Sequence, residues 1–214
     1  DWLVLSKGHC APALYSVLVL RGFFPMDWLK TLNKPGTKLP SHADARTVPG
    51  IDMCTGSLGQ GISAAVGIRT FLIIGDGEIN EGQVWEACQT AAHYKLDRFV
   101  CFVDWNKKQL DGKLEEISDP IDIRRKFEAF GFDSTFAIGY DTAGIYNAVI
   151  RAKSCSGLPH CIILDTYKGI GINFAENQYL NHHLTCSKEE CESAIAELEK
   201  RYAAGTYPGG EKTW

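Results

Sequence analysis

One short stretch limits most strongly what this chain can fold into: the apolar residues 71–74, followed directly by Gly75-Asp76-Gly77. A short run that ends in two isoleucines is typical of a buried parallel strand. The glycines allow a sharp turn and a close approach of the backbone to a ligand. Asp76 is therefore expected at the carboxyl end of a strand, where open α/β sheets bind ligands. Its carboxylate suits Mg²⁺ or Ca²⁺, although an Asp that caps a strand–turn–helix corner fits this stretch equally well.

A second apolar run, residues 99–103, ends in Asp104-Trp105-Asn106. The residues between Gly77 and Asn106 suffice for one helix, predicted over 83–95, and one strand. Two successive parallel strands then bring Asp76 and Asn106 to the same edge of a sheet. A shared ligand site at that edge is the expected consequence.

The rest of the chain alternates between helical and strand patterns, which predicts an α/β fold with a parallel sheet and helices on both faces. We expect one domain over 1–204 and a tail over 205–214. Further strands are predicted over 132–138 and 161–164, and further helices over 11–20, 27–32, 57–68, 119–130, 142–153 and 187–202. Their expected caps are Asp27, Thr55 or Ser57, Asp119-Pro120, and a Ser187/Glu190 capping box. No turn residue separates the helix ending near Ile68 from the strand starting near Phe71, so we expect residues to be missing there.

Composition excludes several classes of function. The 214 residues are 45% hydrophobic, which fits one soluble domain with a sizeable core. A net charge of -4 without a basic block argues against a nucleic-acid partner. No apolar run approaches the roughly 20 residues of a membrane helix, and no signal peptide is visible. The 8 cysteines never form Cys-x-x-Cys, which favours reduced thiols and a cytoplasmic location.

Three histidine-bearing segments are candidates for a site. His42 lies in the Pro- and Gly-rich residues 33–50, expected to be a long irregular loop. It could face a cleft or make only local surface hydrogen bonds. Small residues at 54–67 allow close approach of either a cofactor or another helix. His182 and His183 stand near Cys186 and Cys191, but this spacing matches no standard closed zinc site.

Five segments, in this order along residues 2–185, resemble the N-terminal, diphosphate-binding half of transketolase. They are Leu5-Ser-Lys-Gly-His9, Pro49-Gly-Ile-Asp52, Thr55-Gly-Ser-Leu-Gly-Gln-Gly61, Gly75-Asp-Gly-Glu-Ile-Asn-Glu-Gly82 and Asp104-Trp-Asn-Lys-Lys-Gln-Leu-Asp-Gly112. The resemblance implies the thiamine diphosphate-binding fold. It also implies that Asp76, the Asn106 side chain and the Lys108 carbonyl bind a divalent metal (Mg²⁺, or Ca²⁺ or Mn²⁺) that holds the diphosphate. Lys108 stands where the family usually has an apolar residue, a change that a backbone ligand tolerates.

The resemblance assigns roles to other residues as well. The remaining cofactor-binding positions it implies are Gly56, Ser57 (in place of a common Pro), Leu58, Gly75, Gly77, Glu78 and His182. His9, His42 and His182 would be the catalytic histidines, which contact the diphosphate or the substrate's hydroxyls. His183 stands where the family usually has Gly, which leaves open which of the two adjacent histidines acts. Glu81 and Glu86 match an acidic network at the family's subunit interface, or are simply acids near a helix N-terminus.

The activity implied is transfer of a two-carbon ketol unit from a ketose to an aldose, with a sugar phosphate or related acidic sugar as substrate. The chain resembles split transketolases, in which the Glu that activates the cofactor and the arginines that bind phosphate lie on a C-terminal partner subunit. We therefore expect the chain alone to be inactive and the enzyme to be a two-plus-two assembly. The competing interpretations are deoxyxylulose-phosphate synthase, the decarboxylating component of 2-oxoacid dehydrogenases, and a non-catalytic cofactor-binding subunit. Leu5-Ser-Lys-Gly-His9 and Pro40-Ser-His42 favour transketolase over the dehydrogenases.

Overall fold

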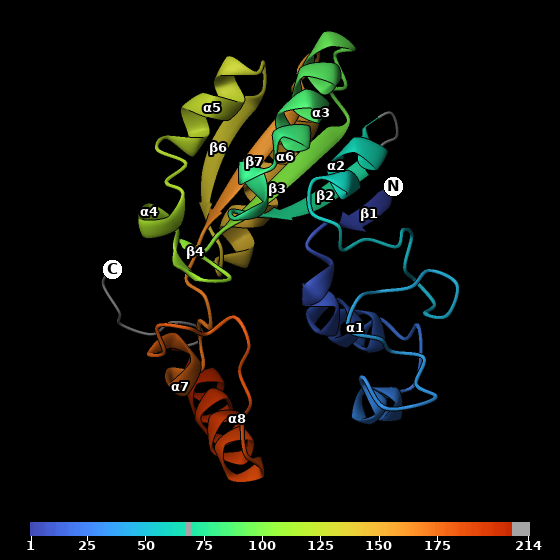
Figure 1. The fold of residues 1–214 in the computed structure, drawn as a ribbon, viewed down its shortest axis with the longest axis vertical. Coiled ribbons are helices and arrows are strands. Elements are labelled where there is room, and N and C mark those ends of the chain that lie inside the picture. The colour runs from blue at the N-terminus through green and yellow to red at the C-terminus, as the bar shows by residue number, and fades with distance from the viewer. Residues whose placement is uncertain (67–69, 207–214) are drawn as a thin grey trace.

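The computed structural model describes residues 1–66 and 70–206. Its centre is a five-stranded, wholly parallel sheet in the order β1-β2-β3-β7-β6 (Figure 1). The strands are β1 (Trp2–Leu5), β2 (Thr70–Gly75), β3 (Phe99–Trp105), β6 (Asp133–Ile138) and β7 (His160–Asp165). The predicted α/β class with a parallel sheet is confirmed. The gap was expected between Ile68 and Phe71; residues 67–69 lie outside the described residues, as does most of the predicted tail.

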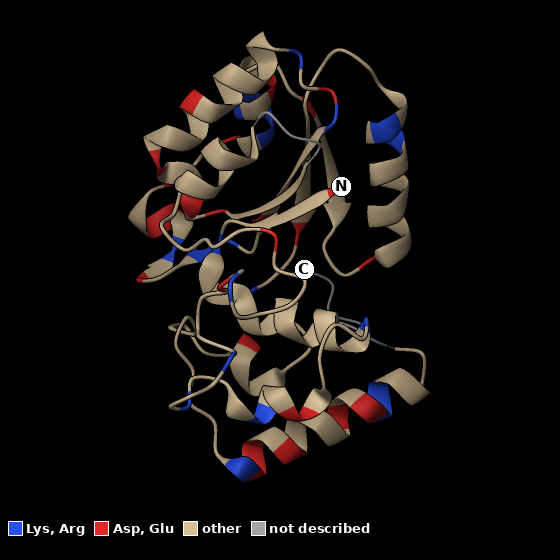
Figure 2. Ribbon diagram, turned by 90° about the vertical axis from the view of Figure 1, so that its right-hand side faces the viewer, with Lys and Arg blue, Asp and Glu red and all other residues tan. Residues whose placement is uncertain are grey.

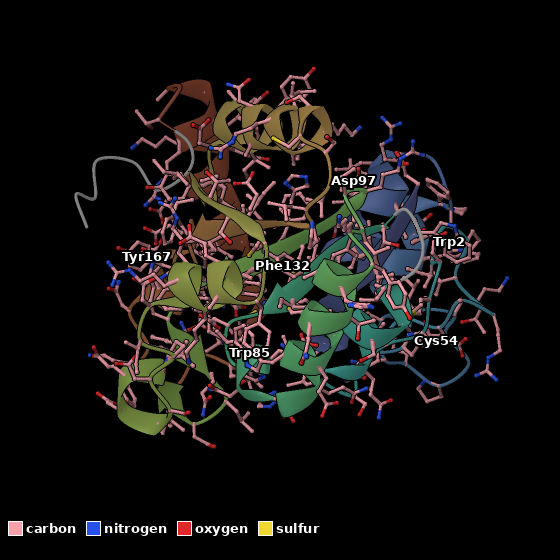
Figure 3. All side chains as sticks on the ribbon, turned by 90° about the horizontal axis from the view of Figure 1, so that it is seen from above. Trp2, Cys54, Trp85, Asp97, Phe132 and Tyr167 are labelled. Atoms are coloured by element: carbon pink, nitrogen blue, oxygen red, sulfur yellow. The ribbon has the colours of Figure 1, made fainter. Side chains whose placement is uncertain are left out.

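Helices cover both faces of the sheet, as predicted. Figures 1 and 2 show α2 (Gln60–Ala65), α3 (Gly82–His93) and α5 (Ile123–Ala129) on one face and α6 (Thr142–Ser154) on the other. The larger core lies under the first three helices, because their apolar faces meet the fully buried inward side chains of the strands. Trp85 and Phe132, labelled in Figure 3, belong to this layer. A smaller core joins Val100 and Ile162 of the sheet to α6.

The segments below the carboxyl edge of the sheet in Figure 1 form two groups. On one side, α1 (Ala11–Leu20) packs with the irregular residues that follow it around a second core containing Tyr15 and Leu39. On the other side lie α7 (Asn173–Glu176) and α8 (Lys188–Ala203). A small hairpin, β4 (Lys108–Gln109) with β5 (Gly112–Lys113), and the short helix α4 (Leu114–Ile117) follow β3. The helix predicted over 11–20 and the capping box of Ser187 and Glu190 are both confirmed.

One boundary was predicted wrongly, and one strand was missed. The helix expected to open at Asp119-Pro120 begins only at Ile123, since Ile121 has a φ of 61° and a left-handed residue cannot continue a right-handed helix. Asp122 caps α5 by accepting the backbone N–H of Arg125. The strand β1 was not predicted as a strand, because four residues are too few to show a period.

Two predicted caps are also wrong. Helix α2 begins after Gly59, which adopts a φ of 82° and provides no side-chain cap. The hydroxyl of Thr55 instead donates to the carbonyl oxygen of Leu5 and ties the loop to β1. The 3₁₀ helix Met26–Thr31 follows Pro25, and Asp27 pairs with Lys30 on the surface rather than capping it. In the described part of the chain, no helix combines the length and apolar character needed to cross a membrane.

Replacement of Phe127 by Ala tests the main core. Phe127 is fully buried, and its ring lies 5.2 Å from that of Trp85 and 5.5 Å from that of Phe132 between ring centroids. We expect Phe127→Ala to lower the free energy of unfolding by about 3–5 kcal/mol, measured by urea denaturation, because it leaves a cavity. Phe136→Ala is the matched control, since Phe136 is 49% exposed. Equal losses in the two variants would contradict this placement of the core.

Candidate functional site

The carboxyl ends of β2 and β3 bring together the two polar residues predicted to share a site. Asp76 follows β2, and Asn106 follows β3. The backbone N–H of Asp76 donates to the carbonyl oxygen of Asp104 at 3.2 Å, which ties the two strand ends together. Asp76 is 1% exposed and Asn106 7% exposed, so both side chains have left bulk water. This is the sheet edge that the spacing of the two motifs predicts.

The Asp76 carboxylate is held by backbone donors. Oδ1 accepts the N–H of Gly77 at 2.9 Å and Oδ2 that of Lys107 at 2.6 Å, while Asn106 Oδ1 accepts the N–H of Lys108 at 3.1 Å. Burial, followed by the charge of Asp104, raises the pKa of Asp76 to about 7. A cation beside this carboxylate would favour its ionised form. A carboxylate, an amide oxygen and a backbone carbonyl are hard oxygen donors that suit Mg²⁺ or Ca²⁺.

The site offers few protein ligands for a metal ion, and this limits which ions it can bind. Among residues 1–66 and 70–206, no group of three or more His, Cys, Asp or Glu side chains could hold a metal ion. The zinc alternative at His182, His183, Cys186 and Cys191 therefore has no supporting cluster. Asp76, Asn106 and the Lys108 carbonyl fit a cation that takes its remaining ligands from water and from an anion such as a diphosphate.

A buried carboxylate holds the walls of the site in place. Glu78 is 1% exposed and accepts hydrogen bonds from the hydroxyl of Ser6, the N–H of Gly59 at 2.9 Å and the N–H of Gly75 at 3.2 Å. These donors come from the end of β1, the loop before α2 and the end of β2. Glu78 was predicted to bind the cofactor. It lines the cavity described next, but its oxygens are occupied by these protein donors.

A cavity of about 440 Å³ opens beside Asp76. Most of the predicted site residues line it, together with two lysines, Lys7 and Lys168, that were not predicted. The site residues on its wall are Lys7, His9, Gly56, Leu58, Gly75, Asp76, Gly77, Glu78, Asn106, Lys108, Lys168 and His182. A second cavity of about 470 Å³ shares Lys7, His9, Asn106, Lys168 and His182 with the first, so the two form one hollow along the strand ends.

Two predicted residues are not on this wall. Ser57 is exposed and lines neither cavity. His42 is exposed, and its ring packs directly against Gly56, where an added Cβ would overlap the imidazole. Gly56 also has a φ of 142°, a conformation that favours glycine. His42 therefore adjoins the cavity through Gly56.

Lys7 and Lys168 place two basic side chains on the wall of the hollow. Lys7 follows β1, is 7% exposed and pairs with Asp104. Lys168 lies in the loop after β7, and its Nζ is 2.7 Å from His182 Nδ1. Burial, followed by the charge of Lys7, lowers the pKa of Lys168. The sequence offered a signal only for Lys168, because its loop follows a predicted strand whose carboxyl end meets this edge.

The histidines of the hollow are neutral at physiological pH. The ring centroids of His9 and His182 are 5.0 Å apart. Burial, followed by the charge of Lys7, lowers the pKa of His9 to about 4, and burial, followed by the charge of Lys168, lowers that of His182 to about 4. Neutral imidazoles can exchange hydrogen bonds and protons with hydroxyl groups. His182 lines both cavities, whereas His183 lines neither.

Comparison with known proteins gives one consistent match. The family model described as "Transketolase, thiamine diphosphate binding domain" matches residues 1–70 and 68–204. The subunit SqwG of 6-deoxy-6-sulfo-D-fructose transketolase from Clostridium sp. is 47% identical, over 95% of this chain and 78% of that protein. One subunit of the apulose-4-phosphate transketolase from Actinobacillus succinogenes is 37% identical, over 93% of this chain and 76% of that protein.

Solved structures agree with the sequence comparisons. The transketolase of Campylobacter jejuni superimposes with a TM-score of 0.84 at 29% identity and covers 93% of this chain. A transketolase variant from Pichia stipitis in complex with fructose 6-phosphate has a TM-score of 0.78 at 26% identity and covers 95% of this chain. The match spans only 34% and 37% of those two chains, so this chain corresponds to about a third of their length.

The low proton affinity of the two histidines in the hollow is directly measurable. We expect the imidazole resonances of His9 and His182 to titrate near pH 4 in NMR spectra of the ligand-free chain, well below the ordinary value of about 6.5. Because their pKa is lower in the folded state, stability is fully present above pH of about 6.5 and is lost as pH falls toward 4. His182→Gln should lose less stability than the wild type over that interval. Midpoints near 6.5 for both rings would contradict their desolvation.

Proposed function

This chain belongs to the transketolase family, as its thiamine diphosphate binding domain, and from that premise we propose that it is the N-terminal subunit of a two-chain transketolase. Such an enzyme moves a two-carbon ketol unit from a ketose to an aldose. The observation that carries the proposal is the position of Asp76 and Asn106 at the ends of adjoining strands. Both line a cavity that is also lined by Lys7, Lys168 and His182. The cytoplasm is the compartment we propose, because it keeps the free thiols reduced.

The residues of the hollow fit a diphosphate held through a divalent cation. Asp76, Asn106 and the Lys108 carbonyl would hold Mg²⁺, and Lys7 and Lys168 supply positive charge for the phosphate oxygens. The backbone of Gly77 lies next to the same space. A Cβ added at Gly77 would lie 3.0 Å from Gln109 Cβ, so a larger residue would be crowded there. Bound thiamine diphosphate supplies the electron sink that stabilises the carbanion formed when a ketose carbon–carbon bond breaks.

The histidines would handle the hydroxyl groups of the substrate. His9 and His182 line the hollow in their neutral form, so each can accept a hydroxyl proton at one ring nitrogen or donate one from the other. His42 adjoins the same hollow through its contact with Gly56. His9 and His182 thus face the space in which a sugar chain would lie next to the cofactor, and His42 adjoins it.

The substrate we propose is an acidic sugar, either a phosphate or a sulfonate. Support comes from relatives whose names specify 6-deoxy-6-sulfo-D-fructose and apulose-4-phosphate. The acid group of the substrate and the aminopyrimidine of the cofactor would be bound by a C-terminal partner subunit. That partner would carry the activating Glu, and two copies of each chain would form the enzyme. The naming of the same relatives as subunits supports the two-chain arrangement.

A charge-removing substitution tests the metal site. Asp76→Asn should weaken binding of thiamine diphosphate in the presence of Mg²⁺ by about 100-fold, which corresponds to about 2.7 kcal/mol. Isothermal titration calorimetry of the full chain, with and without Mg²⁺, measures this change. Asp27→Asn is the control, because Asp27 pairs with Lys30 on the exposed surface and lines neither cavity of the site. Unchanged Mg²⁺-dependent binding in Asp76→Asn would refute the site.

An activity assay tests the two-chain proposal. The purified chain with thiamine diphosphate and Mg²⁺ should show no ketol transfer, and activity should appear when it is co-expressed with the product of the neighbouring open reading frame. Matched phosphorylated and sulfonated ketoses as donors distinguish the two substrate classes. Turnover by the single chain would contradict the requirement for a partner.

A further inference from the structure

The start of α8 carries two cysteines in direct contact. The sulfur atoms of Cys186 and Cys191 lie 2.7 Å apart. Both thiols are free, and Cys186 is exposed while Cys191 is partly exposed. A small oxidant can therefore reach this pair from solvent.

The capping of α8 explains why the two sulfur atoms are in contact. Ser187 is the N-cap of α8 and forms a reciprocal capping box with Glu190. Cys186 is the residue before the cap, and Cys191 is the fourth residue of the helix. These are the two positions whose side chains meet when a helix begins with a capping box, an arrangement usually filled by apolar residues. The cap thus holds the two sulfur atoms together.

A second close pair of cysteines provides an internal contrast. Cys101 of β3 and Cys161 of β7 are partners in the sheet register, and both are fully buried. Burial raises the pKa of Cys101 well above its ordinary value and keeps oxidants away from it. The cysteines are therefore close together in both pairs, but of these two pairs only the one at α8 can also be reached by an oxidant from solvent.

We propose that Cys186 and Cys191 form a reversible intrachain disulfide, and that a low-molecular-weight disulfide such as glutathione disulfide is the oxidant. One cysteine thiolate attacks a sulfur of the oxidant and releases one glutathione thiolate, which takes up a proton. The second cysteine, as thiolate, attacks the protein sulfur of the mixed disulfide and releases the other glutathione. The protein loses two electrons and two protons, and glutathione disulfide becomes two thiols.

The thiolate requirement gives the reaction a pH dependence. The hydrogen bond to Cys186 raises the pKa of Cys191. Because the thiolate is the form that attacks a disulfide, the reaction accelerates as pH rises.

The bond would stabilise the junction between the site and α8. Cys186 lies four residues after His182, so the segment that carries His182 leads straight into the cysteine pair. No residue of α8 is fully buried, and charged residues alternate along it at the bottom of Figure 2. The capped first turn is the end of α8 that adjoins the His182 segment along the chain. Closing the pair fixes that turn and, with it, one end of the His182 segment.

The inference does not depend on the proposed transketolase activity, and peptide mapping tests it. The full chain is equilibrated with glutathione disulfide, free thiols are alkylated after unfolding, and the chain is cut with trypsin. Because Lys188 lies between the two cysteines, a disulfide joins two tryptic peptides into one species. We expect this species in oxidised samples, its loss after addition of reduced glutathione, and alkylated Cys101 and Cys161 throughout.

Single substitutions supply the controls. Cys191→Ser should leave Cys186 as a mixed disulfide with glutathione, and Cys186→Ser should do the same for Cys191. Cys155→Ser, which removes an exposed cysteine elsewhere, should form the joined species like the wild type. A wild-type chain in which either cysteine stays reduced or remains a mixed disulfide would overturn the proposal.

Hydrogen exchange tests the link to the site. Oxidation should slow amide exchange over residues 182–192 in the wild type and leave it unchanged in Cys186→Ser. Equal exchange in the oxidised and reduced wild type would show that the bond does not stabilise this segment. That result would overturn the proposed connection between the cysteine pair and the position of His182.

Discussion

The buried carboxylate of Glu78 is the interaction on which the site depends most. Removing such a group from water is costly unless donors replace its hydration. Here the donors are the hydroxyl of Ser6 and the N–H groups of Gly59 and Gly75, each from a different segment. One carboxylate thereby fixes the end of β1, the loop before α2 and the end of β2 against one another. The segments also pack backbone to backbone, since a Cβ added at Gly8 would lie 2.6 Å from the Thr55 carbonyl oxygen.

The sequence was sufficient for most of the fold, because long elements carry their own periodicity. Helix α3 shows an apolar stripe, and the boundaries of α1 and α8 follow from Pro12 and from the capping box. Prediction failed where local and tertiary effects compete. The four-residue strand β1 exists because it pairs with β2, and α5 starts late because Ile121 turns left-handed. Neither event leaves a periodic signal.

The site was predictable only in part, and for a related reason. Asp76 and Asn106 could be placed at one edge because each follows a recognisable strand. Lys7 could not, since it follows the strand that was missed. The hairpin β4–β5 and the segment after α7 contact each other, since Lys108 Nζ donates to the Gln178 carbonyl oxygen at 2.9 Å. Contacts between two loops far apart in sequence have no signature in a single chain.

Burial, followed by the charges of the hollow, explains the neutral state of its histidines. Lys7 and Lys168 provide the positive field that an anion would need, and the same field opposes protonation of His9 and His182. A diphosphate placed among these lysines would cancel part of that field and raise the pKa of both imidazoles. Their ability to take a proton from a sugar hydroxyl would then be greatest when the anion is bound. A single arrangement of cations would thus both attract the cofactor's diphosphate and make the basicity of the histidines depend on its presence.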